Sequence, residues 1–125
     1  MKYPKHNDLI CPNFIFGSHD DFSIILDLYV GYDNDFNLVI LCEQTNYERP
    51  DSICALCAIV EKEEAYKLSR KLNVSINDLP REISNAMSHY EKINCPEPSD
   101  VRDCFREITE CIVEEGCKFK MIKTP

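Results

Sequence analysis

Glycine is scarce in this sequence, with three residues in 125, and histidine is equally rare. So few glycines leave few places for the sharp turns that cradle a phosphate or a cofactor. The sequence contains no glycine-rich phosphate loop, no nucleophile elbow and no helical pair of histidines at metal-binding spacing. It therefore supplies no catalytic residues, and we expect no cofactor and no bound metal.

Long apolar runs are also missing. No stretch approaches the roughly 20 apolar residues of a membrane-spanning helix, and residues 1–6 lack the apolar core of a signal peptide. There is no internal repeat and no low-complexity tract. We expect a protein that does not enter the membrane, is located in the cytoplasm and forms one α+β domain over residues 1–125.

Positive charge is in short supply. The formal net charge is -8, and residues 1–60 carry three Lys and Arg against nine Asp and Glu. Residues 61–125 are closer to balance, with eleven against thirteen. Direct nucleic-acid binding is disfavoured, because phosphate contacts need Lys and Arg. A basic protein partner would be attracted, although a modest acidic surplus also simply maintains solubility.

Cysteine is plentiful by contrast, with eight residues. Without a secretion signal, we expect free thiols, most of them buried on the apolar faces of strands and helices. The pair Cys54 and Cys57 has the spacing of a zinc knuckle or a redox motif. Residues 52–60 are typical of a strand, however, and a strand directs these two side chains to opposite faces. The cysteines are Cys11, Cys42, Cys54, Cys57, Cys95, Cys104, Cys111 and Cys117.

Three consecutive strands are predicted over residues 22–32, 36–43 and 52–60, because apolar residues alternate along them. Asp33-Asn34-Asp35 between the first two is typical of a tight turn. Pairing Tyr32 with Phe36 keeps the apolar residues on one face and gives a three-residue loop. The segment from Leu9 to Phe16 is a candidate edge strand, since Pro12 is unfavourable in a central one.

Three helices are expected after this meander. The first begins near Glu61, the second enters at residues 77–80 and continues to Tyr90, and the third is capped by Ser99 with Cys111 on its buried face. Gly116 is placed to end the third helix, and a short strand with lysines on its outer face follows. The predicted fold class is α+β: a mainly antiparallel sheet, made of an N-terminal three-strand meander and a C-terminal strand, packed by three helices.

The second face of this sheet is too apolar to be bare. It carries Ile25, Tyr29, Val39 and Leu41, and the N-terminal segment, one helix or a partner must cover it. We predict a partner or homodimer interface here, continuing to the acidic turn. The predicted partner-binding residues are Asp27, Tyr29, Asp33, Asp35, Val39, Leu41 and Glu43.

These patterns favour a small acidic, non-enzymatic protein-binding module of the immunity-protein or inhibitor kind. The alternative is a small enzyme or metal-binding protein that uses His19, Asp20 and nearby carboxylates. A pocket that gathers His19 with other titratable groups would favour the alternative, and a flat acidic surface would favour binding.

Overall fold

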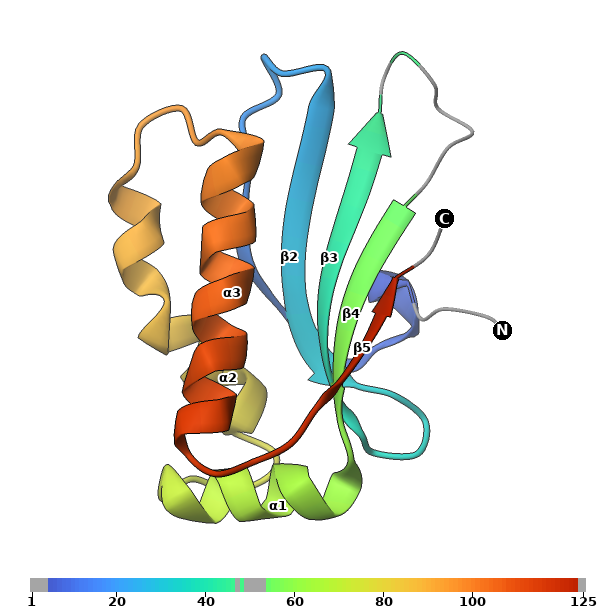
Figure 1. Ribbon diagram of the computed structural model, residues 1–125, viewed down its shortest axis with the longest axis vertical. Coiled ribbons are helices and arrows are strands. Elements are labelled where there is room, and N and C mark those ends of the chain that lie inside the picture. Colours follow the sequence, from blue (N-terminus) through green and yellow to red (C-terminus); the bar gives the residue numbers. More distant parts are fainter. Residues whose placement is uncertain (1–4, 47, 49–53, 124–125) are drawn as a thin grey trace.

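A computed structural model describes residues 5–46, 48 and 54–123 of the chain. It contains a five-stranded antiparallel sheet in which every strand pairs with its sequence neighbour (Figure 1). The strands are β1 (Ile10–Gly17), β2 (Ile24–Tyr32), β3 (Leu38–Asn46), β4 (Cys54–Val60) and β5 (Lys120–Lys123). The helices are α1 (Lys62–Lys71), α2 (Leu79–Ala86) and α3 (Pro98–Glu114), with short 3-10 turns η1 (His6–Asp8) and η2 (Ser88–Lys92).

The predicted α+β class is confirmed. The candidate edge strand at Leu9–Phe16 is confirmed as β1, at one edge of the sheet, and it extends the predicted three-strand meander to four strands. β5 is the other edge, and the lysines at both of its ends suit an exposed strand because charge discourages pairing with other chains. None of the helices among the described residues is long and apolar enough to cross a membrane.

The register predicted between β2 and β3 is wrong by two residues. Tyr32 pairs with Leu38 and not with Phe36, so residues 33–37 form a five-residue loop. Asp33 holds this loop: its Oδ1 accepts hydrogen bonds from the backbone N–H groups of Asp35 and Asn37, both at 2.9 Å. Phe36 has a left-handed φ of 62° and is 55% exposed. Since the shift is an even number, every side chain of both strands stays on its predicted face.

The main core lies between the sheet and the helices. α3 runs alongside the sheet with α2 and η2 next to it, while α1 crosses the end of the sheet (Figure 1). The strands contribute alternate residues from one face, and the helices contribute residues at helical spacing. Fully buried members include Leu28, Val30, Leu38, Ile40, Leu79, Val101 and Cys104.

The helix ends differ from the prediction at two places. α2 ends at Ala86, and Tyr90 lies in the separate 3-10 turn η2, where its ring still packs against Phe16 at a centroid distance of 5.4 Å. α3 begins at Pro98, one residue before the predicted Ser99 cap. Its first turn is closed by Asp100, whose Oδ2 accepts a 2.8 Å hydrogen bond from the backbone N–H of Glu97.

All the cysteines are free, as predicted, but not all are buried. Cys42, Cys57, Cys104 and Cys117 are buried, whereas Cys11, Cys95 and Cys111 are exposed. The prediction for Cys111 is therefore wrong. The buried stripe of α3 passes through Ile108 and Ile112 and leaves Cys111 beside it.

Candidate functional site

The second face of the sheet has its own small core. Val39 and Leu41 of β3 and Cys57 of β4 are completely buried there, and Leu9 packs on them. Gly31 makes room for Leu9, because a Cβ at position 31 would lie 3.0 Å from the Leu9 Cβ. The N-terminal segment therefore folds over this face, as one of the predicted arrangements proposed. Val39 and Leu41 are consequently not accessible to a partner from the surface.

His6 fastens that N-terminal segment to the sheet. Its Nδ1 lies 2.6 Å from Oε1 of Glu43, and its backbone N–H donates a 3.2 Å hydrogen bond to Oε2 of the same residue. The imidazole also stacks on the ring of Tyr29, with 4.6 Å between centroids. Two of the predicted binding residues, Tyr29 and Glu43, are thus partly covered by a histidine that the sequence reasoning did not select.

Asp27 and Glu43 lie directly opposite each other on neighbouring strands. Burial raises the pKa of the Asp27 carboxyl, the negative charge of Glu43 raises it further, and His6 partly offsets both effects. Like charges placed opposite each other destabilise a sheet, so this pair carries a cost that His6, bonded to Glu43, partly offsets.

The Asp27 carboxylate leans over Gly17, its partner on β1. A Cβ at position 17 would lie 2.5 Å from Asp27 Oδ1 and 3.1 Å from the ring of Phe14. Phe14 is 55% exposed and meets Tyr29 edge-on at 5.5 Å. Burial raises the pKa of Tyr29, and the charges of Asp27 and Glu43 add to the shift. An exposed aromatic side chain therefore lies next to the carboxylate pair.

Sequence reasoning missed Phe14 for a geometric reason. Phe14 pairs with Tyr29, and Phe16 pairs with the adjacent residue Leu28, so β1 carries an irregularity between them. The extra residue turns Phe14 and Phe16 to opposite faces of the sheet, although alternation would place them on the same one. Phe16 is accordingly buried at 5% exposure among the helices, while Phe14 remains at the surface.

The remaining predicted binding residues lie in the loop between β2 and β3. The Asp33 side chain is engaged in holding the loop, and Asp35 is exposed at its tip. The structure thus divides the predicted set into two loop residues, of which only Asp35 is exposed, two buried residues and a carboxylate–aromatic group on the second face. We call Phe14, Asp27, Tyr29 and Glu43 the acidic–aromatic patch.

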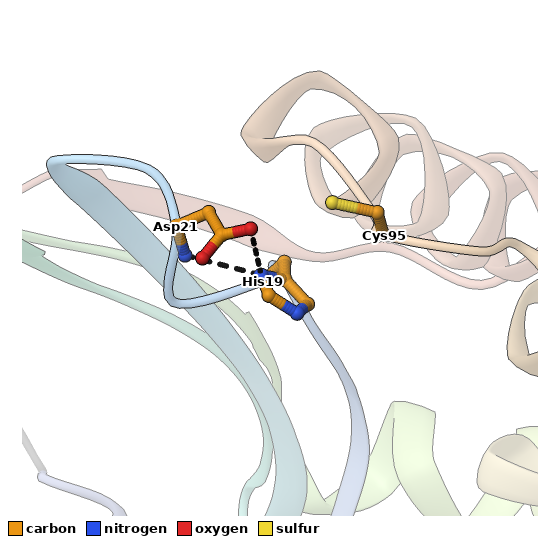
Figure 2. A group of neighbouring side chains, drawn as sticks. All are labelled: His19, Asp21 and Cys95. Atoms are coloured by element: carbon orange, nitrogen blue, oxygen red, sulfur yellow. Dashed lines mark hydrogen bonds and ion pairs between the residues drawn. The ribbon is translucent and has the colours of Figure 1, made fainter.

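The alternative site at His19 lies in the loop between β1 and β2. His19 Nδ1 is 3.3 Å from carboxylate oxygens of both Asp20 and Asp21. The same nitrogen accepts a 3.1 Å hydrogen bond from the backbone N–H of Asp21. Cys95, from the linker before α3, joins His19 and Asp21 (Figure 2). The side chains of His19, Asp20 and Asp21 are 41%, 80% and 74% exposed, so the group lies on an open surface.

Comparison with known proteins adds no assignment. No family model matches the chain, and no curated protein and no solved structure matches it either.

Proposed function

We propose that the protein is a non-enzymatic protein-binding module that receives a lysine or arginine side chain of a basic partner on the acidic–aromatic patch. The observation that carries the proposal is the Asp27–Glu43 pair, two carboxylates opposite each other with His6 bonded only to Glu43. A cation supplied by the partner would relieve their repulsion and meet Asp27 in a partly desolvated setting, where a charged hydrogen bond is strong.

The aromatic members of the patch suit the same ligand. The exposed ring of Phe14 and its neighbour Tyr29 offer apolar surface to the methylene stem of a lysine or arginine. A cation close to an aromatic face gains roughly 0.5–1 kcal/mol at an exposed site. Tyrosine is also among the residue types that most often dominate protein–protein affinity.

The charge of the whole chain supports a basic partner. The net charge is -8, and the sheet half of the chain holds most of the surplus. The negative electrostatic potential of this surplus attracts a basic surface and increases its rate of association. Within this proposal the protein acts in the cytoplasm, and an inhibitor or immunity protein that covers the basic site of an enzyme is the kind of module that fits.

The test compares two charge-matched double variants as bait in a host lysate. Asp27→Asn with Glu43→Gln removes the patch charges, and Glu110→Gln with Glu114→Gln removes two exposed charges from α3. We expect a basic protein to bind the wild-type and the α3 variant, to be lost from the patch variant, and to bind less at high salt. The proposal would be refuted if the captured proteins bind the patch variant and the α3 variant equally well.

A second copy of the chain is the competing occupant of the patch. A two-fold contact places the same surface on both sides, and here it would bring carboxylates against carboxylates. Sedimentation at high concentration separates the two cases. A monomer supports the basic partner, whereas a dimer that Tyr29→Glu dissociates, with circular dichroism unchanged, replaces it by a homodimer.

A further inference from the structure

We propose that His19, Asp21 and Cys95 bind a divalent transition-metal ion, with zinc as the best match, and that the ion joins the β1–β2 loop to the linker before α3. One imidazole nitrogen, one carboxylate oxygen and one thiol sulfur lie within 4.8 Å of one another (Figure 2). The three come from two segments that are distant in the sequence. This inference concerns a different surface from the acidic–aromatic patch and stands independently of it.

The donor set selects the class of metal. Zinc accepts nitrogen, sulfur and oxygen ligands together, and its bonds to them are about 2.0–2.3 Å. Calcium and magnesium take oxygen ligands almost exclusively, so a thiolate and an imidazole exclude them as preferred ions. Three protein ligands would leave a fourth tetrahedral position for water, or for Asp20, whose Oδ1 already lies 3.3 Å from His19 Nδ1.

The distances are close to what a zinc ion needs. His19 Nδ1 and Asp21 Oδ2 are 3.3 Å apart. This is about the separation, roughly 3.3 Å, of two ligand atoms bound tetrahedrally at 2.0–2.1 Å. The sulfur is the donor that has to approach, and an exposed cysteine side chain is free to do so. In Figure 2 the Cys95 sulfur lies on the side of its backbone that faces the loop of Asp21.

The backbone holds the two segments together without any metal. The N–H of His19 donates a 2.8 Å hydrogen bond to the carbonyl oxygen of Pro96, the residue after Cys95. Cys95 itself has a left-handed φ of 52°, which is unusual for a residue with a side chain. The fold therefore places the backbone of Cys95 beside the His19 loop, and only the rotamer of the thiol has to adjust to bind the ion.

Metal binding has one competitor inside the site. The lone pair of His19 Nδ1 now accepts the backbone N–H of Asp21 at 3.1 Å. A metal ion would take that lone pair in its place, and the freed N–H would turn to water, since the loop is exposed. Cys95 binds the ion as the thiolate, so binding releases the thiol proton to solvent.

Cobalt(II) titration of the reduced full chain tests the site, because a cobalt–thiolate bond gives a charge-transfer absorption band. We expect one equivalent to produce the band in the wild-type protein. Cys95→Ser and His19→Ala should abolish the band and weaken binding at least about tenfold. Cys111→Ser, which removes another exposed thiol, should leave both unchanged.

Zinc and the melting temperature provide the second readout. Zinc should raise the melting temperature of the wild-type and Cys111→Ser proteins in proportion to the logarithm of its concentration, and should not raise that of Cys95→Ser or His19→Ala. Circular dichroism without metal verifies that each variant is folded. Absence of the cobalt band in the wild-type protein, or its persistence in Cys95→Ser, would overturn the proposal and would leave the acidic–aromatic patch unaffected.

Discussion

The imidazole of His6 lies parallel to the phenol ring of Tyr29, with 9° between the two planes. The stack and the bond to Glu43 fix the start of the described chain on the second sheet face. Stacked aromatic pairs contribute roughly 0.5–1.5 kcal/mol and hydrogen bonds to a charged group roughly 1.5–3 kcal/mol, with the lower values expected for a partly exposed side chain.

His6→Ala should therefore destabilise the fold by about 1–2 kcal/mol in urea unfolding. His89→Ala is the matched control, because His89 forms an exposed ion pair with Glu107 and its ring lies tilted by 39° against the Tyr90 ring at the surface. We expect it to cost less than about 1 kcal/mol. Equal losses in the two variants would mean that the N-terminal segment is not held by His6.

Asp27→Asn should stabilise the isolated protein at neutral pH, by roughly 0.2–1 kcal/mol, the usual size of a cross-strand pair effect. The folded-state pKa of Asp27 is raised above 3.8, so its contribution to stability is favourable below that pH and is lost as the pH rises through the folded-state value. The gain of the Asn variant should thus appear at pH 7 and vanish near about pH 3.5. Urea unfolding at the two pH values measures it, and a loss of stability at pH 7 would contradict the cost assigned to the carboxylate pair.

Stability should fall steadily in alkaline solution. Burial raises the pKa of the Cys42 and Cys104 thiols and of the Tyr32 hydroxyl to about 12, and that of Cys57 to about 11. The unfolded chain ionises its cysteines near 9.0 and its tyrosines near 10.0, so it releases protons that the folded chain retains. Between these values and about 12, the free energy of unfolding decreases as the pH rises.

Melting temperatures measured in reducing buffer between about pH 8 and pH 11 should therefore decrease as the pH rises. The slope of melting temperature against pH is the quantity to compare between variants. Cys104→Ala should have a shallower slope than the wild-type protein, because one buried thiol no longer titrates. A melting temperature that does not change with pH would contradict the burial of these groups.

Ile108→Ala should cost roughly 2–5 kcal/mol, because Ile108 is 2% exposed between α3 and the sheet. Glu110→Ala, on the exposed side of the same helix, should change the free energy of unfolding by less than about 0.5 kcal/mol. Glu107 is a poorer control than its sequence position suggests, since it accepts a 3.3 Å hydrogen bond from the Tyr90 hydroxyl. Similar costs at Ile108 and Glu110 would show that the buried face of α3 is misassigned.

Alternation along residues 22–32 and 36–43 predicted which side chains share the buried face of the sheet, and this prediction is confirmed by the burial of Leu28, Val30 and Ile40. The prediction of faces is correct although the predicted loop is too short, because a register shift of two residues leaves each side chain on the same face. The length itself depended on Asp33, whose carboxylate gathers backbone N–H groups across the loop. A sequence pattern does not encode how many such bonds one side chain will accept.

The acidic–aromatic patch was predictable only in part. Strand alternation predicts that Asp27, Tyr29 and Glu43 share the second face of the sheet. Phe14 depends on an irregularity in β1, and His6 depends on a contact with Glu43 across 37 residues. Cys95 likewise reaches His19 only because the linker before α3 bonds to the β1–β2 loop. Such long-range placements are decided by packing and not by periodicity.

The pairing of β4 with β5 has a consequence for biosynthesis. β4 ends at Val60, and its edge is covered only when Lys120–Lys123 have been made. At about 5–20 residues per second, the nascent chain carries an open, apolar strand edge for several seconds or more. Any chain that stops before Lys120 retains that edge permanently, ready to pair with its copies. The four residues of β5 therefore cover the β4 edge last, after every other strand of the sheet has been made.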